Sequence, residues 1–155
     1  MRMTLAALTL MLALAAPAQG ANKQSWDFVK SGNDEAQVAY GVPESDSITI
    51  VFRCFMKTKR IEIITSVLPR KPKNGQALRT TLSNGARAVI HDGKIGKSTE
   101  EYHFEASVPA EPKAVAILKP GTLLTIGIKG KQVPVPLRGV AKPLGEFEKV
   151  CFGGT

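Results

Sequence analysis

The chain contains few of the side chains that carry most metal and cofactor chemistry. Its 155 residues include two histidines, two cysteines and one tryptophan, and aromatic residues make up only 6%. His91 and His103 lie twelve positions apart, without a helical i, i+4 spacing and without a thiolate nearby, which argues against a zinc site. The sequence therefore predicts no metal and no cofactor, and it places both histidines on the surface at strand ends.

Catalytic motifs are also missing. No Gly-x-Ser-x-Gly sequence, which exposes a nucleophilic serine in many hydrolases, occurs in the chain. No glycine-rich phosphate-binding motif occurs either. We therefore favour a protein without catalytic residues. One alternative stays open, a small hydrolase in which Ser45 and His91 act with the acidic neighbours Glu44 and Asp46.

No apolar run is long enough to cross a membrane, which takes about 20 residues. The longest run, Leu5 to Ala15, follows Arg2 and precedes the small residues 16–18, the order that is typical of a secretory signal peptide. We predict a signal peptide over residues 1–18, with cleavage as late as residue 21 as an alternative. No cysteine directly follows the run, which argues against a lipid anchor. Arg2 is the one arginine that precedes it, which argues against twin-arginine export. We expect a protein that is soluble in the periplasm or outside the cell.

The remaining residues, 22–155, are predicted to form a single domain. The composition is 43% hydrophobic, which excludes a disordered chain, and the formal net charge is +8. A basic exported protein meets acidic surfaces, so the expected partner is an anionic envelope polymer or a lipid headgroup, or else another protein. Nucleic acid is disfavoured, because export separates the protein from it and the aromatics do not alternate with the lysines. The sequence predicts no particular oligomeric state.

Most of this domain alternates apolar and polar residues with a period of two, which predicts β-strands. The expected strands cover residues 48–54, 61–67, 78–83, 86–91, 101–108, 121–128 and 132–137. Turns are expected at Asn84-Gly85, Asp92-Gly93 and Lys129-Gly130. Pro134 and Pro136 have no N–H to donate to a neighbouring strand, so the last strand is predicted to lie at an edge.

Two segments have a helical character. Pro112 suits the first turn of a short helix within residues 109–119. From residue 139 onward the apolar residues recur on one helical stripe, which ends at Cys151. We predict an α+β fold: an antiparallel, meandering β-sheet of about seven strands, with a short helix and a C-terminal helix.

The two cysteines are predicted to form a disulfide. Cys54 shares a strand face with Ile50 and Phe52, and Cys151 lies on the apolar stripe of the final helix. Both therefore point toward the core, and a pair in an oxidising compartment is oxidised by default. The competing interpretation, a cysteine nucleophile or metal ligand, lacks a nearby histidine. The disulfide would tie the C-terminal helix to the sheet.

An acidic turn stands out in this basic chain. Residues 40–46 join an aromatic residue, Tyr40, to a turn that carries Glu44 and Asp46. These side chains could bind a cation or an arginine of a partner. They could equally stabilise the turn, because Asp and Ser side chains bond their own backbone there.

The basic residues are clustered. The clusters are Lys57, Lys59 and Arg60; Arg70, Lys71 and Lys73; and Lys129, Lys131 and Arg138. The first two flank one predicted strand and could converge on one edge, as a binding surface for an anion or a polymer. The alternative is an ordinary solvated surface.

Two segments carry a resemblance. Residues 39–54 contain a Tyr-Gly-x-Pro-Glu-x-Asp turn that leads into a strand ending in a cysteine, and residues 137–151 form a final helix that ends in the second cysteine. The matching residues are Tyr40, Gly41, Pro43, Glu44, Asp46, Cys54 and Cys151. This pattern resembles small exported proteins of Gram-negative bacteria without an assigned activity. The final helix and its cysteine are more loosely similar to invasion-associated locus B type periplasmic proteins. Neither resemblance implies a catalytic residue.

Overall fold

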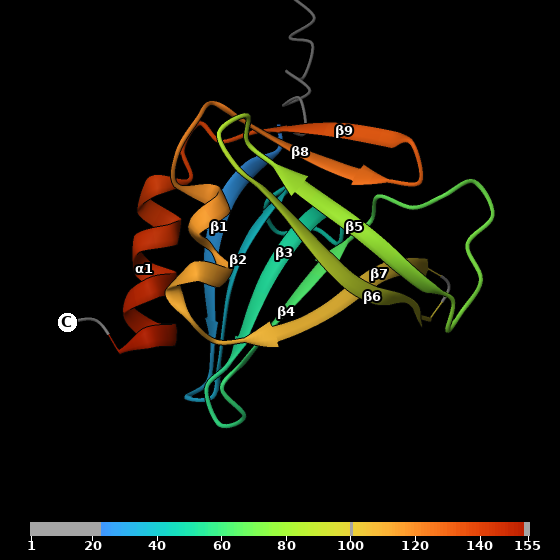
Figure 1. The fold of residues 1–155 in the computed structure, drawn as a ribbon. Coiled ribbons are helices and arrows are strands. Elements are labelled where there is room, and N and C mark those ends of the chain that lie inside the picture. Colours follow the sequence, from blue (N-terminus) through green and yellow to red (C-terminus); the bar gives the residue numbers. More distant parts are fainter. Residues whose placement is uncertain (1–22, 100, 154–155) are drawn as a thin grey trace, which may run out of the picture.

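The computed structural model describes residues 23–99 and 101–153, so the predicted signal peptide over residues 1–18 lies outside the described part. Nine strands, two short 3₁₀ turns and one α-helix make up the fold (Figure 1). The strands are β1 (Ser25–Ser31), β2 (Glu35–Gly41), β3 (Ile48–Phe55), β4 (Arg60–Thr65), β5 (Ala77–Ser83), β6 (Ala88–Ser98), β7 (Glu101–Pro109), β8 (Leu123–Ile128) and β9 (Lys131–Pro136). The 3₁₀ turns are η1 (Pro112–Ala114) and η2 (Ala116–Leu118), and the helix is α1 (Ala141–Phe152).

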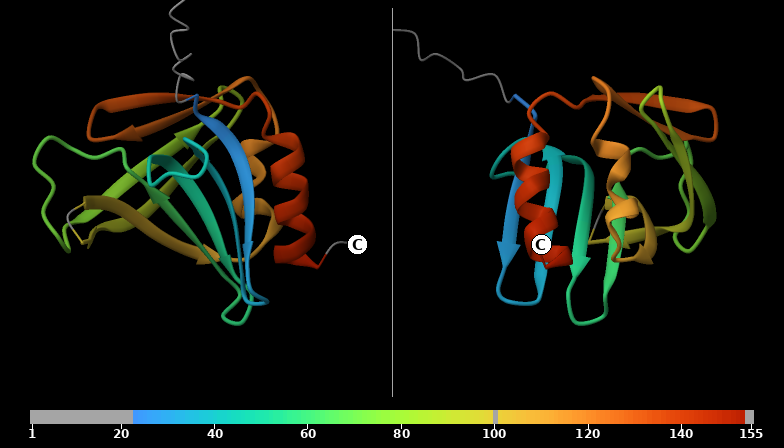
Figure 2. Two further views of the ribbon diagram at one scale, coloured as in Figure 1. Left: turned by 180° about the vertical axis from the view of Figure 1, so that it is seen from behind. Right: turned by 60° about the vertical axis from the view of Figure 1, so that its left-hand side comes forward.

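All nine strands belong to one antiparallel sheet, in the order β1-β2-β3-β4-β7-β6-β5-β8-β9. The sheet curls strongly, so that its two halves enclose the core, and α1 covers one side of it (Figure 2). The helix packs on β1 and β2. The α+β class is confirmed, and the strand number is nine rather than about seven.

The two strands that the sequence analysis missed are β1 and β2. Their pattern is period two, with Trp26 on the inner face of β1 and Ala36, Val38 and Tyr40 on the inner face of β2. Both strands have seven residues, and β1 exposes most of its residues, because it lies at the edge of the sheet. Its alternation is therefore too weak to predict a strand.

The turn expected at Asp92-Gly93 is wrong, because both residues lie inside β6. Gly93 is required by packing. A Cβ atom at this position would lie 2.6 Å from Cζ of Phe104 and would also collide with the Glu105 carbonyl oxygen. The glycine therefore lets the Phe104 ring pack against the strand, and β6 continues to Ser98.

The turn at Asn84-Gly85 is confirmed, and it joins β5 to β6 with a φ of 84° at Gly85. Asn84 is buried, and its side-chain amide donates to the Ile117 oxygen at 2.9 Å and to the Pro120 oxygen at 3.0 Å. Its side-chain oxygen accepts from the N–H groups of the next turn residues. Asn84 therefore ties this hairpin to the segment before β8.

The short helix expected within residues 109–119 is instead the pair of 3₁₀ turns. Val115 separates them with φ of −111° and ψ of 2°, outside the helical region. This geometry lets Val115, Ile117 and Leu118 all point into the core. A continuous α-helix would spread three residues at this spacing over more than one face.

The disulfide between Cys54 and Cys151 is confirmed, and it joins β3 to α1 across 97 positions. The prolines of β9 also lie in an edge strand, as expected. Within residues 23–99 and 101–153, no helix is long and apolar enough to cross a membrane.

Candidate functional site

The acidic turn after β2 is built by its own backbone and side chains. The Ser45 hydroxyl donates to the Val42 oxygen at 2.8 Å and accepts from the Ser47 N–H at 3.2 Å. Both functions of this hydroxyl are thus used by the turn. Glu44 has a φ of 57°, which places it in the left-handed region. The turn-forming role is therefore observed for Ser45, while Glu44 and Asp46 stay exposed.

Tyr40 lies in the core below this turn. Its ring is buried and packs on Trp26, with ring centroids 5.4 Å apart. The turn itself borders a hollow of 340 Å³ over the ends of β1 and β2, where Asp27 joins Glu44 and Asp46. Of the predicted acidic-turn residues, the two carboxylates face solvent and the tyrosine does not.

His91 is buried, which contradicts its expected place on the surface at a strand end. It lies in the middle of β6, points inward and faces Thr80 of β5. His91 Nε2 and Thr80 Oγ1 are both buried without a hydrogen-bond partner among the described residues. Burial lowers the pKa of His91, because it penalises the charged imidazolium.

The proposed pair Ser45 and His91 does not form a site. Ser45 follows β2, and three strands, β3, β4 and β7, separate β2 from β6 in the sheet. The serine hydroxyl is bonded within its turn and the imidazole faces the core. The structure therefore leaves the hydrolase alternative without a catalytic geometry.

His103 lies on the outer face of β7. Its ring covers Gly96 of β6, where a Cβ atom would lie 2.6 Å from Nε2, and Nε2 lies 3.5 Å from Oε2 of Glu105. With Asp46 and Arg53 it borders a hollow of 580 Å³. In the described part of the chain no hydroxyl is hydrogen-bonded to His103, and no three His, Cys, Asp or Glu side chains are placed to share a metal ion.

The first two basic clusters do not converge. Lys59 and Arg60 lie at the start of β4 and Arg70 follows its end, roughly 17 Å away along the strand at about 3.3 Å per residue. Lys57 pairs with Asp34 at 2.6 Å, and Arg60 donates to the Ser107 oxygen at 2.9 Å. The first cluster is thus partly neutralised by Asp34, and the predicted convergence of the two clusters on one edge is not observed.

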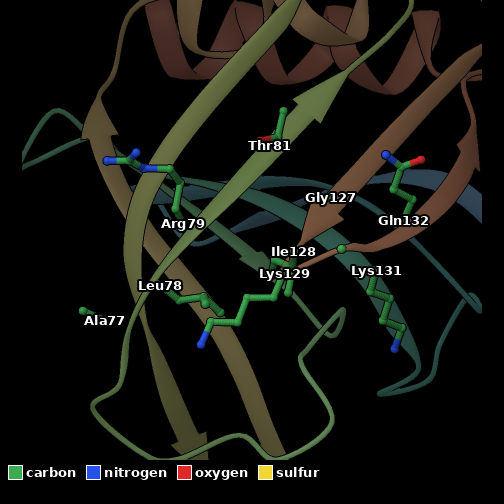
Figure 3. Close-up of a pocket in the computed structure, with 10 residues that line it drawn as sticks. Ala77, Leu78, Arg79, Thr81, Gly127, Ile128, Lys129, Lys131 and Gln132 are labelled. Carbon is green, nitrogen blue, oxygen red and sulfur yellow. The ribbon is translucent and has the colours of Figure 1, made fainter.

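Arg70 of the second cluster instead lies near Lys129 and Lys131 of the third cluster, at the β8–β9 turn. A hollow of 640 Å³ is lined by Leu68, Pro69 and Arg70 on one side and by residues 129–131 on the other. A second hollow, of 530 Å³, lies on the other side of the same turn and is bordered by Arg79 of β5. The Lys129 and Lys131 side chains leave the turn in different directions (Figure 3). We name Arg70, Arg79, Lys129 and Lys131 the β8–β9 surface.

The β8–β9 surface carries positive charge without an acidic residue in its lining. Arg79 is the one member with a carboxylate partner in the described chain, since its Nε lies 2.7 Å from Oδ1 of Asp92. This hydrogen bond raises the pKa of Arg79 and lowers the pKa of Asp92. The nitrogens of Arg70, Lys129 and Lys131 have no described carboxylate within 4.0 Å. Arg138 is not a member, because it follows the far end of β9.

The turn at the centre of this surface is strained. Lys129 has a φ of 43° and Gly130 a φ of 80°, the two positive values of a type I′ hairpin turn. Asn, Asp or Gly normally occupies the first of these positions, and another residue costs about 1 kcal/mol there. The chain thus keeps a lysine where glycine, asparagine or aspartate would be more stable.

Comparison with protein-family models, with curated proteins and with solved structures found no match. The geometry of the β8–β9 surface is therefore the basis for inferring a function. Sequence reasoning found all members of the β8–β9 surface except Arg79, but it joined the wrong pair of clusters. The one local signal for the correct site was the Lys-Gly-Lys sequence of a tight turn.

Proposed function

We propose that the protein is an exported, non-enzymatic binding protein that holds an anionic component of the cell envelope on the β8–β9 surface. The observation that carries this proposal is the convergence of Arg70, Lys129 and Lys131 around two adjoining hollows whose lining contains no carboxylate. The ligand class is a polymer or a lipid headgroup that displays phosphate groups. The resemblance to small exported Gram-negative proteins and the signal peptide over residues 1–18 belong to the same proposal.

The chemistry of the surface suits phosphate groups. Arg70 offers the planar, forked donor set that can bind two phosphate oxygens at once, and the lysines on either side of the turn add point charges. Each cation near an anionic surface contributes about 1 kcal/mol, so three give weak binding to one group. A polymer or a membrane offers many such groups, and simultaneous contacts then raise the apparent affinity.

Strained backbone conformations cluster at functional sites, and Lys129 has a φ of 43°. Lys59 has a φ of 49° as well, so the positive φ does not by itself distinguish the β8–β9 turn from the control cluster. The disulfide between Cys54 and Cys151 is consistent with an oxidising compartment, where envelope components are found.

The test compares two triple variants that remove the same charge. One is Arg70→Ala, Lys129→Ala and Lys131→Ala. The matched control is Lys57→Ala, Lys59→Ala and Arg60→Ala, at the opposite end of β4. Binding is measured to phosphatidylglycerol vesicles, to neutral phosphatidylcholine vesicles and to soluble polyphosphate. We expect the first variant to bind the anionic probes at least about tenfold more weakly, while the control stays within about threefold.

Two outcomes decide the proposal. Equal losses in both triple variants would show a response to net charge alone, and the site would be wrong. An affinity that does not change between low and high salt would exclude a charge-driven site, because exposed charges are screened within about 10 Å at 0.1 M salt. Comparing vesicles with soluble polyphosphate separates a headgroup from a polymer as the source of the phosphate.

A further inference from the structure

Strand β6 is unpaired along half of one side, although it lies in the middle of the sheet. On one side β5 pairs with residues 88–94. On the other side β7 pairs only with residues 94–98 and then leaves to follow β4. Figure 1 shows β6 and β7 diverging beyond this short pairing. We name the unpaired side of Ala88–Gly93 the β6 open edge.

The backbone groups at the open edge follow from the antiparallel alternation. The Ile95 N–H donates to the Gln76 oxygen at 2.9 Å, and the Gly75 N–H donates to the Ile95 oxygen at 2.7 Å. The backbone N–H and C=O groups of Ile95 therefore point to the β5 side, and those of every second residue before it do the same. The residues between them, Ala88, Ile90 and Asp92, point their N–H and C=O groups to the open edge.

These groups are accessible to a partner. Among the described elements, β5 and β7 are the ones that pack along β6, and Ala88, Ile90 and Asp92 are all exposed. None of the backbone bonds outside the sheet ladders involves Ala88, Ile90 or Asp92. Three N–H and three C=O groups are thus in place for a further strand.

The side chains at the open edge are unusually apolar for the surface. Ile90 is 59% exposed and Val89 is 37% exposed, and both are among the few large hydrophobic residues that face solvent. Proteins normally protect a free strand edge with lysine, proline or a covering element, because it invites pairing with another chain. Residues 88–93 contain neither lysine nor proline.

The wedge between β6 and β7 is acidic. A hollow of 500 Å³ there is lined by three carboxylates, Glu62, Asp92 and Glu105, and by one cation, Lys94. Lys94 Nζ lies 3.2 Å from Oε1 of Glu105, and Arg79 Nε lies 2.7 Å from Oδ1 of Asp92. Glu62 is the lining carboxylate that has no described cation within 4.0 Å. In a chain with a net charge of +8, this local excess of negative charge favours a positively charged occupant.

We propose that the β6 open edge binds an extended segment of a partner protein by β-strand addition, in which a peptide strand hydrogen-bonds to the free edge of a sheet. The segment carries an apolar side chain beside Ile90 and a lysine or arginine that reaches Glu62. A second copy of this chain fits less well, because its own edge would bring the same acidic wedge and because β7 bounds the space. This proposal is independent of the anion-binding surface at the β8–β9 turn.

The test uses a short capped peptide of alternating threonine and valine with one central lysine, added to the folded protein. Amide hydrogen exchange is followed by NMR. We expect the amides of Ala88, Ile90 and Asp92 to exchange at least about tenfold more slowly with the peptide, while that of Val89, which faces β5, does not change. Two N-methylated peptides provide the matched control. Methylation of the alternate residues whose N–H groups point to β6 should block binding, whereas methylation of the residues in between, whose N–H groups point away, should not.

Variants of the protein add a second test. Ile90→Pro removes the N–H at the centre of the open edge without removing a bond to β5, and Ile90→Thr keeps both that N–H and a β-branched side chain. We expect at least about tenfold weaker binding for Ile90→Pro and less than about threefold for Ile90→Thr. Glu62→Gln should weaken the binding of the lysine peptide but not the binding of a peptide in which norleucine replaces the lysine. If Ile90→Pro does not fold, the methylated peptides still decide the proposal.

Three results would overturn it. The first is no change in the exchange of Ala88, Ile90 and Asp92 at millimolar peptide. The second is protection at the β1 edge instead, for example at Val29. The third is slow exchange of these amides in the free protein together with a dimer in sedimentation, which would show that a second copy occupies the edge.

Discussion

The Trp26 indole Nε1 donates to the Pro136 carbonyl oxygen at 2.7 Å, and this bond joins the first strand of the sheet to the last. The backbones of β1 and β9 are not hydrogen-bonded to each other, so a side-chain hydrogen bond connects the two edge strands at this point. The bond lies at the boundary of the core, where Trp26 also packs on Tyr40. It gives the curled sheet a testable point of closure.

Replacing Trp26 by Phe is expected to destabilise the fold by about 1–3 kcal/mol. The change keeps an aromatic ring but leaves the Pro136 oxygen without its donor and removes some buried area. Urea unfolding, followed by circular dichroism, measures the free energy. Tyr102→Phe, at a half-buried aromatic residue away from the closure, is the control and should change it by less than about 0.5 kcal/mol. Equal effects would show that this bond does not hold the closure.

Protonation of His91 is expected to destabilise the fold below neutral pH. Its pKa in the folded state is lowered by burial, whereas the unfolded chain has the ordinary value of about 6.5. The unfolded state therefore binds more protons, so stability is fully present above about pH 6.5 and decreases as the pH falls through this value toward the lower folded pKa. Urea unfolding between pH 8 and pH 5 measures the slope.

Two variants isolate this effect. His91→Gln should remove the pH dependence between pH 8 and pH 5, whereas His103→Gln, on the outer face, should retain it. Thr80→Val should be neutral or slightly stabilising, because the Thr80 hydroxyl is buried without a partner. A strong loss of stability in Thr80→Val would indicate that the hydroxyl is hydrogen-bonded in the folded protein.

Replacing Gly93 by Ala tests whether this residue belongs to a strand or to a turn. The added Cβ would collide with the Phe104 ring, so we expect the free energy of unfolding to decrease by about 1–3 kcal/mol. Gly145→Ala is the matched control, since it lies in α1 with no atom within 4 Å of the new Cβ. Alanine favours a helix by about 1 kcal/mol over glycine, so this control should be stabilising. A neutral Gly93→Ala would contradict the packing.

Replacing Lys129 by Asn should raise stability while it weakens anion binding. Asparagine tolerates the positive φ at this position, which relieves about 0.5–1 kcal/mol, and the substitution removes one cation from the β8–β9 surface. Lys131→Asn removes the same charge at a residue without a positive φ, so it should weaken binding without the gain in stability. Thermal unfolding and polyphosphate binding measure the two effects. A Lys129→Asn protein with unchanged affinity would remove this lysine from the site.

Loss of the disulfide should destabilise α1 first. The bond closes a loop of 97 positions, and such a cross-link removes on the order of 4–5 kcal/mol of unfolded-chain entropy in the simple model. The Cys54→Ala/Cys151→Ala double variant is expected to exchange the amides of α1 faster than those of β3. Thiol titration of the exported protein provides the direct check, and two free thiols would contradict the bridge.

Local pattern was sufficient for much of this fold. Alternating residues predicted β3 to β5 and β7 to β9, because the side-chain period of a strand is written into neighbouring positions. Pro134 and Pro136 predicted an edge strand, since their missing N–H is a property of the residues themselves. The facing of Cys54 and Cys151 followed from the same periodicities, and it identified the bridge.

Only the tertiary structure decided what depends on distant contacts. Gly93 lies in a strand because the Phe104 ring of β7 needs its space, and no local signal distinguishes this from a turn. His91 is buried because β6 continues past it. Arg70 lies near Lys129 because the sheet order places β8 beside β5. The first two basic clusters are close in the sequence, but they lie at opposite ends of β4 and therefore do not meet. The β6 open edge arises in the same way, from β7 leaving β6 to pair with β4.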